Sequence, residues 1–173
     1  MVTVRRTTLT VHKDPFNSIH ALLKRRKYSA VLQRMFHANT SRLKREYRTD
    51  SNHAWYIVGD VLFRKAKFKP AAEAFRKSLR SRPNDSEAAW ALGNVYSEMA
   101  KPDLAERYFR RALRHDRTND SVRYNLGNAL FDQKKFKSAI DVYRTVKRSS
   151  PKEFKLARKN IERAKARLGQ KLK

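Results

Sequence analysis

Three glycines recur at a fixed distance in the middle of this 173-residue chain, and they constrain its fold more than any other feature. Gly59, Gly93 and Gly127 are each separated by 34 residues. An alanine follows each glycine at a constant offset, and a large ring follows each alanine: Ala71 and Phe75, Ala105 and Phe109, Ala139 and Tyr143. A fixed period near this length is the signature of stacked helix pairs. Glycine and alanine would let the two helices of each pair approach closely.

The three copies, residues 52–85, 86–119 and 120–153, resemble the tetratricopeptide repeat, or TPR. Trp55 and Pro83 complete the first copy, Tyr96 and Ala112 fit the second, and Pro151 fits the third. Several positions depart from the family pattern: Ser78, Ala89 at the tryptophan position, Arg117 at the proline position, Arg123 and Val146. The resemblance implies an all-α, right-handed α-solenoid of three repeats.

Helical patterns also flank the repeats. In residues 15–51, apolar side chains fall on one face from Phe16 to Leu23 and again from Tyr28 to Phe36, on either side of a basic run. We expect an N-terminal helical hairpin there, either a degenerate repeat that caps the stack or an unrelated hairpin. Residues 38–51 would extend the second helix or link it to the first repeat.

The C-terminal segment, residues 154–173, is expected to form a basic capping helix and a tail. Leu156, Ile161, Ala164 and Leu168 share one face of a helix over about residues 153–168. A capping helix is typical of repeat arrays because the last repeat would otherwise expose its apolar face. Gly169 is expected to end the helix.

The charge of the chain indicates an acidic partner. The formal net charge is +26, which would disfavour self-association and attract polyanions. The chain has no cysteine, which excludes disulfides, and no apolar run long enough to span a membrane. The basic arm, residues 1–14, is compatible with an organelle transit peptide or with a disordered tail. We expect an intracellular protein, and the compartment, mitochondrial or other, stays open.

The residue inventory predicts neither catalysis nor a cofactor or metal site. Three of the four glycines belong to the repeats and Gly169 lies near the end of the chain, so none remains for a phosphate-binding loop. The five histidines are scattered and lack the spacing of metal ligands.

The TPR resemblance implies that the first helix of each repeat lines a concave groove. An aromatic residue recurs at one groove position, and amides and lysines accompany it: Tyr56, Asp60, Trp90, Asn94, Tyr124, Asn125, Asn128, Lys155 and Lys159. We expect the aromatic column of Tyr56, Trp90 and Tyr124 to bind a protein or peptide and to stand apart from the core.

Co-chaperone members of the family clamp the acidic tails of heat-shock chaperones, and part of that clamp has counterparts here. Asn94, Asn125 and Lys155 match by residue type, whereas Lys159 replaces an arginine and Trp90 replaces a lysine. The resemblance therefore keeps a chaperone-type, peptide-binding adapter among the alternatives.

The second helices of the repeats carry the positive charge on the back of the expected solenoid: Arg76, Lys77, Arg80, Arg107, Arg110, Arg111, Arg114, Arg144, Lys147 and Arg148. Such a surface suits RNA phosphates or an acidic protein. We therefore expect a non-catalytic scaffold, first as a subunit of a ribonucleoprotein particle. The alternatives are a scaffold on an acidic protein surface, such as a microtubule wall, and the chaperone-type adapter.

Overall fold

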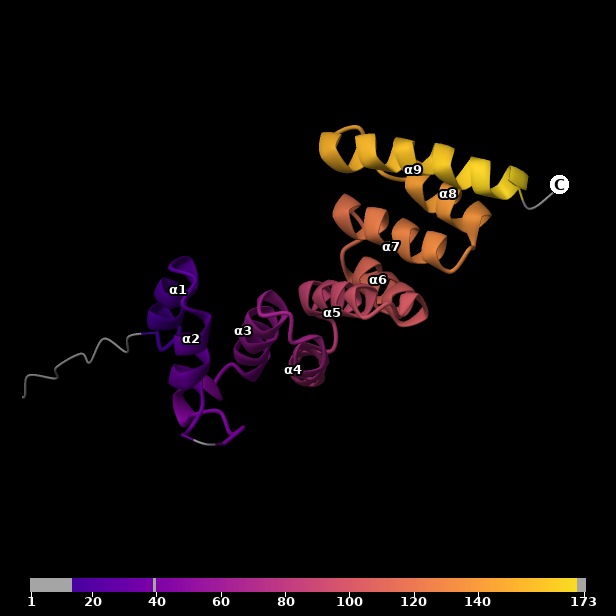
Figure 1. Ribbon diagram of the computed structural model, residues 1–173. Coiled ribbons are helices and arrows are strands. Elements are labelled where there is room, and N and C mark those ends of the chain that lie inside the picture. The colour runs from indigo at the N-terminus through magenta and orange to yellow at the C-terminus, as the bar shows by residue number, and fades with distance from the viewer. Residues whose placement is uncertain (1–13, 39, 171–173) are drawn as a thin grey trace, which may run out of the picture. The chain divides into compact units, whose positions relative to one another are not determined.

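The computed structural model describes residues 14–38 and 40–170, which form nine α-helices and one 3-10 helix. The chain divides into two compact units, Met1–Thr49 and Asp50–Lys173, which are described separately (Figure 1). Consecutive helices pack as antiparallel pairs, so the expected all-α repeat architecture is confirmed.

The N-terminal unit contains the predicted helical hairpin. Helix α1 (Asn17–Lys24) packs against α2 (Tyr28–Met35), and Ile19, Val31 and Met35 are fully buried. Residues after α2 do not extend it: Phe36 forms an isolated antiparallel bridge with Leu43, followed by the 3-10 helix η1 (Arg45–Tyr47). The ring of Tyr47 then lies 5.5 Å from that of Phe16 and closes the core of the unit. The basic arm lies outside the described residues except for Asp14.

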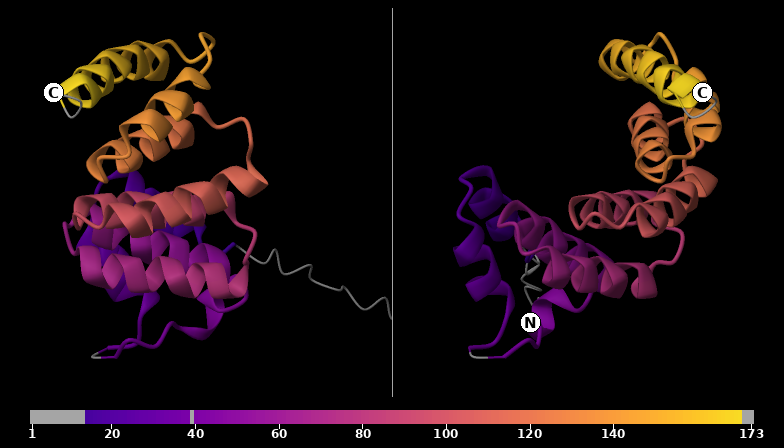
Figure 2. Two further views of the ribbon diagram at one scale, coloured as in Figure 1. Left: turned by 90° about the vertical axis from the view of Figure 1, so that its right-hand side faces the viewer. Right: turned by 45° about the vertical axis from the view of Figure 1, so that its right-hand side comes forward.

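The C-terminal unit is a stack of seven helices within residues 50–170, in which each helix packs on the next (Figure 2). They are α3 (Ser51–Arg64), α4 (Phe68–Ser81), α5 (Ser86–Glu98), α6 (Pro102–His115), α7 (Asp120–Asp132), α8 (Phe136–Arg144) and α9 (Pro151–Gln170). The odd-numbered helices also contact one another in sequence, from α3 to α9. These helices therefore share one face of the stack.

The repeated glycines allow the rings of the following helix to pack against the helix backbone. A Cβ atom on Gly93 would lie 2.5 Å from Cε1 of Phe109, and one on Gly127 would lie 2.4 Å from Cε1 of Tyr143. Gly59 has the same relationship with Phe75, at 2.7 Å. The period seen in the sequence is thus the period of a close approach between a helix and a buried ring.

The turns inside the helix pairs share one backbone conformation. Ala66, Ala100 and Lys134, again 34 residues apart, have positive φ angles of 54°, 53° and 61°. In the turn at Ala100, the N–H of Ala100 bonds to the carbonyl of Ser97, and that of Lys101 bonds to the carbonyl of Tyr96. These bonds satisfy carbonyl groups that the end of the helix would leave free. Arg26, between α1 and α2, has φ 55° and the same pair of bonds.

The last helix differs from its expected bounds at both ends. It begins at Pro151, because proline suits the first helical position, where its fixed φ is already helical and no N–H is needed. It continues through Gly169 to Gln170, so Gly169 does not end it. Glycine inside a helix costs only about 1 kcal/mol relative to alanine, which the neighbouring helix-forming residues offset.

Candidate binding surfaces

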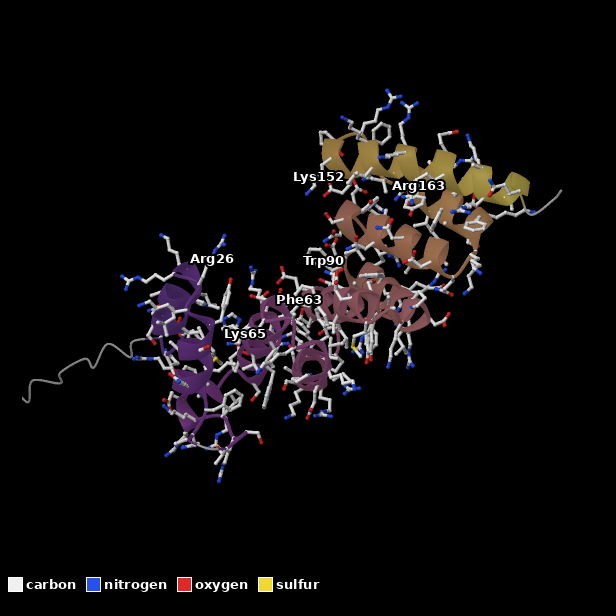
Figure 3. The ribbon with its side chains drawn as sticks, viewed as in Figure 1. Arg26, Phe63, Lys65, Trp90, Lys152 and Arg163 are labelled. Carbon is white, nitrogen blue, oxygen red and sulfur yellow. The ribbon has the colours of Figure 1, made fainter. Side chains whose placement is uncertain are left out.

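The face shared by α3, α5 and α7 is called here the inner face and comprises Tyr56, Asp60, Phe63, Trp90, Asn94, Tyr124, Asn125, Asn128 and Phe131. Each of these side chains is partly accessible to solvent. Figure 3 shows Phe63 and Trp90 on the same side of their helices, away from α4. The helix periodicity thus brings the predicted aromatic and amide residues of three repeats onto one surface.

The aromatic column of this surface lies outside the buried core cluster but packs against it. Tyr56, Trp90 and Tyr124 are half-buried and pack against the hydrophobic core. The Tyr56 ring lies 5.6 Å from that of Phe75, and the Tyr124 ring lies 6.0 Å from that of Tyr143. These rings present an edge to solvent while the core holds their orientation.

Trp90 has a further property that bears on binding. Its indole N–H is buried and has no hydrogen-bond partner among the described residues. A buried donor without an acceptor is costly, on the order of 1–3 kcal/mol.

Amide side chains connect neighbouring repeats next to the aromatic column. The Nδ2 of Asn125 on α7 donates to the Oδ1 of Asn94 on α5 at 2.9 Å. Farther along, the Tyr143 hydroxyl donates to Asn128 at 2.6 Å, and Asn160 of α9 donates to the same Asn128 oxygen at 3.0 Å. These bonds fix the amides at the junctions between successive helices.

The inner face is acidic around Tyr56. Burial is the main cause that raises the pKa of Tyr56 to about 12, and the carboxylates of Glu87, Asp60 and Asp85 add to it. Burial likewise raises the pKa of Tyr143. Arg64 offsets part of the negative charge through an ion pair with Asp60 at 2.7 Å.

The structure brings together part of the residue set that resembles a chaperone clamp. Asn94 and Asn125 are hydrogen-bonded to each other, whereas Lys155 and Lys159 are exposed on α9. Asn160 of α9, which was not predicted, points toward the neighbouring helices and bonds to Asn128 and Tyr143. It occupies the repeat position of Val58, Leu92 and Leu126, and this polar exception in an apolar series was the available signal.

The ten predicted basic residues are called here the basic back, and eight of them lie on the second helices of the repeats. The expectation is wrong for Lys147 and Arg148, because α8 ends at Arg144 and leaves both in the turn that follows. Its ten predicted residues are exposed apart from Lys77 and Arg111, which are partly buried. Lys77 lies 4.2 Å from the centre of the Trp55 ring, and Arg111 donates to the carbonyl of Pro83 at 2.5 Å. Arg110 and Arg144 form ion pairs with Glu106 and Asp141 on their own helices.

Six arginines of the basic back form two regular series. Arg76, Arg110 and Arg144 occupy one repeat position, and Arg80, Arg114 and Arg148 occupy the position four residues later. Arg80 and Arg114 are one helical turn after their partners, whereas Arg148 lies in the turn after α8. The two series were visible in the sequence. The structure adds that all six arginine side chains are exposed on the stacked repeats. We call these six residues the arginine ladder.

Comparisons with known proteins agree with this architecture. A family model described as tetratricopeptide repeat matches residues 56–96 and 90–154. No curated protein matches the chain. None of the helices in the described part of the chain has both the length and the apolar character of a membrane span.

Several solved structures share the fold at low sequence identity. The chain is similar to MamA of AMB-1, with 22% identity, a TM-score of 0.72, and 90% of this chain and 88% of that chain covered. It is also similar to the first TPR of Spaghetti (RPAP3) bound to the HSP90 peptide SRMEEVD, with 19% identity, a TM-score of 0.64 and coverages of 69% and 94%. A third is YrrB, described as having an unusual peptide-binding site, with 22% identity, a TM-score of 0.57 and coverages of 79% and 64%.

Proposed function

The chain belongs to the tetratricopeptide repeat family, and from this premise we propose that it is a non-catalytic adapter that binds a peptide or helix of a partner protein on its inner face. The observation that carries the proposal is the aromatic column. Its rings are held by the core yet remain partly accessible at a 34-residue period. Rings held in this way bind apolar side chains at a low cost in conformational entropy.

The chemistry of the inner face favours a peptide with apolar anchors and no excess of acidic residues. Asp60, Glu87, Glu98 and Asp132 lie at groove positions of the three repeats, and Arg64 is the one basic residue at those positions. Arg163 of α9 adds a positive charge near Asp132, over the ring of Phe131. Asn94 and Asn125 can in addition bond to the backbone of an extended peptide. RPAP3 binds the acidic peptide SRMEEVD, but this chain has Trp90 where the family clamp has a lysine.

Peptide titrations test this choice. Trp90 fluorescence, followed in a Trp55→Phe background, should respond to a neutral peptide with two or three apolar residues. SRMEEVD should bind more weakly. The control variant Arg107→Ala, on the basic back, should bind the neutral peptide like the parent. Tight binding of SRMEEVD that is lost in Lys155→Ala/Lys159→Ala would instead establish the chaperone-type adapter.

The arginine ladder supports a second function, as a ribonucleoprotein subunit that holds RNA on the basic back. A series of paired arginines at a constant period suits a polyanion with repeating charges. The binding constant for single-stranded RNA should then fall steeply with salt, with a slope of about 0.7 per phosphate contact. Replacing Arg107, Arg110, Arg111 and Arg114 by glutamate should weaken binding and reduce that slope.

Two comparisons separate this function from its alternatives. The native protein should co-purify with RNA. Proteins that stay bound after nuclease treatment are bound either at the inner face or, through acidic surfaces of their own, at the basic back. If no RNA binds above background at physiological salt, a scaffold on an acidic protein surface, such as a microtubule wall, replaces the ribonucleoprotein proposal. Loss of RNA binding on Trp90→Ala, with the glutamate variant unaffected, would place the bases on the inner face.

A further inference from the structure

The middle junction of the arginine ladder, between α6 and α7, forms an open pocket that is lined mainly by arginines. The space between the end of α6 and α7 has a volume of about 470 Å³ and is lined by Arg110, Leu113, Arg114, Arg117, Arg123 and Leu126. Four of these six side chains are guanidinium groups, and two leucines complete the lining. Guanidinium groups bind phosphate oxygens through paired, charge-assisted hydrogen bonds.

The pocket exists because the middle junction departs from the repeat pattern at two positions. At the α4–α5 and α8–α9 junctions, the residues equivalent to Arg117 are Pro83 and Pro151, and those equivalent to Arg123 are Ala89 and Ala157. The first repeat has Trp55 at the Arg123 position. The two departures, 6 residues apart in sequence, line the same space. Solubility alone does not explain Arg123, because it is partly buried and exposed positions serve that purpose better.

Arg123 is held in place by the protein. Its side chain is only 17% exposed, and its Nη1 donates to Asp120 at 2.5 Å and to the carbonyl of Thr118 at 3.4 Å. A further bond joins its Nη2 to the carbonyl of Arg117. Asp120 in turn accepts a bond from Ser150 at 2.7 Å. This arrangement orients the guanidinium group before any ligand arrives.

Of the other three arginines that line the pocket, only one is paired with a carboxylate among the described residues. Arg110 is paired with Glu106 at 2.8 Å. Arg114 and Arg117 are exposed, and their side chains form no hydrogen bond or ion pair within the described part of the chain. Two oriented arginines and two available ones thus surround a space that contains no acidic lining residue.

From this geometry we infer that the α6–α7 pocket anchors one phosphate group of a bound RNA strand. RNA is favoured over a phosphorylated protein because the ladder continues on both sides, with Arg76 and Arg80 before the pocket and Arg144 and Arg148 after it. A single phosphorylated side chain would use the pocket but not the flanking arginines. The inference rests on the proposed binding of RNA to the basic back, and the pocket makes the middle junction its strongest point.

The test uses a variant that restores the repeat pattern, Arg117→Pro/Arg123→Ala, in the full-length protein. A matched control, Arg76→Ala/Arg80→Ala, removes the same charge from the first junction, where proline and alanine stand in place of the two additional arginines. The first probe is inorganic phosphate, followed by NMR of the arginine Nε–H groups. We expect saturable shifts of pocket arginines in the parent and in the control, and none in the pattern-restoring variant.

The second probe is a single-stranded RNA oligonucleotide without a terminal phosphate. The pocket variant should lose affinity on the order of tenfold, because hydrogen bonds to a charged group are lost, and the control should lose less. If the first variant does not fold, a second pair of variants makes the same comparison at exposed residues. Arg114→Ala removes a pocket arginine, and Arg80→Ala is its control at the first junction.

The possible outcomes distinguish the pocket from the RNA function. Equal weakening of RNA binding in the pocket variant and its control would overturn the inference, because charge alone would then explain the affinity. Phosphate shifts that do not saturate would overturn it as well. Saturable phosphate binding without RNA binding in the parent would refute the RNA function while retaining the pocket, and a phosphorylated protein would become its ligand.

Discussion

The side-chain amide of Asn160 donates a hydrogen bond to the hydroxyl of Tyr143 across 3.3 Å. In the two preceding repeats, the equivalent positions hold phenylalanine and leucine, Phe75 with Leu92 and Phe109 with Leu126. The third junction has therefore exchanged an apolar pair for a hydrogen-bonded one. The exchange is consistent with the physical cost of burying a hydroxyl, because the Tyr143 side chain is almost fully buried. Its O–H donates to Asn128, and Asn160 supplies a donor to the hydroxyl oxygen.

A double-mutant cycle should measure this exchange. Asn160→Leu alone should destabilise the protein by about 1–2 kcal/mol, because the hydroxyl of Tyr143 loses a partner. Tyr143→Phe/Asn160→Leu restores the pair of the other junctions and should recover most of that loss. Urea unfolding of the parent, both single variants and the double variant gives the coupling energy. Strictly additive effects would show that the two residues do not interact.

The glycine at each helix crossing should resist replacement by alanine. Gly93→Ala would place a Cβ atom 2.5 Å from the buried ring of Phe109, and overpacking of this kind costs about 1–3 kcal/mol. Gly169→Ala is the matched control, since nothing lies within 4 Å of its added Cβ atom. That variant should gain up to about 1 kcal/mol of helix propensity. Thermal melting provides the measurement. Melting temperatures of the two variants that shift in the same direction would contradict the prediction.

The turn at Ala100 should gain stability from the opposite substitution. Its φ of 53° is unfavourable for an L-residue, by about 1–2 kcal/mol, and glycine adopts this conformation readily. Ala100→Gly should therefore raise the free energy of unfolding, although the greater freedom of glycine in the unfolded chain reduces the gain. Ala91→Gly, within α5, provides the control and should be destabilising. Urea unfolding provides the measurement. A lower unfolding midpoint for Ala100→Gly than for the parent would argue against the turn conformation.

Replacing Trp90 separates its structural from its binding role. Because the ring is half-buried, Trp90→Ala should cost less than the 3–5 kcal/mol typical of a buried tryptophan, roughly half of it. Trp90→Phe keeps most of the packing and removes the indole N–H, so it should retain stability or raise it slightly. Denaturant unfolding provides the measurement. A loss with Trp90→Phe as large as that with Trp90→Ala would mean that the N–H has a partner.

Stability at high pH should depend on Tyr56. Its pKa is raised to about 12 in the folded state, whereas an unfolded tyrosine has a pKa near 10. Between these values the unfolded chain loses its proton first, so the contribution of Tyr56 is complete below about pH 10 and declines as the pH rises toward 12. Tyr56→Phe should therefore lose stability less steeply above pH 10. Parallel curves for parent and variant, from urea unfolding at several pH values, would refute the raised pKa.

The sequence was informative at positions where the residue type by itself determines the local structure. Gly93 and Phe109 predict a close helix crossing, and Pro102 marks the first position of a helix, because in both cases a local property of the residue determines its place. The family resemblance likewise placed Trp90 and Tyr124 on one surface. Their packing against the core was not predictable, since the depth of a ring depends on how tightly neighbouring repeats stack.

Other features depend on partners that a sequence does not identify. Asn160 stands out as a polar residue in an apolar series, but its role requires knowing that the hydroxyl of Tyr143 lies opposite. Ala100 and Lys134 have no local preference for positive φ, so the shared turn was not visible. Arg117 and Arg123 were noted as separate departures, and only the packing of α6 on α7 brings them to one pocket.

The contacts between successive repeats differ from one junction to the next, and this limits which repeat can be deleted from the array. Excising residues 86–119 would leave the buried Asn52–Ser78 hydrogen bond, at 2.9 Å, and the Tyr143–Asn160 pair intact on either side of the cut. Excising residues 120–153 removes the same number of residues but places Asn160 opposite Phe109, which has no hydroxyl. Although each repeat has the same length, the repeats are not interchangeable units. Loss of the middle repeat should lower the melting midpoint less than loss of the third.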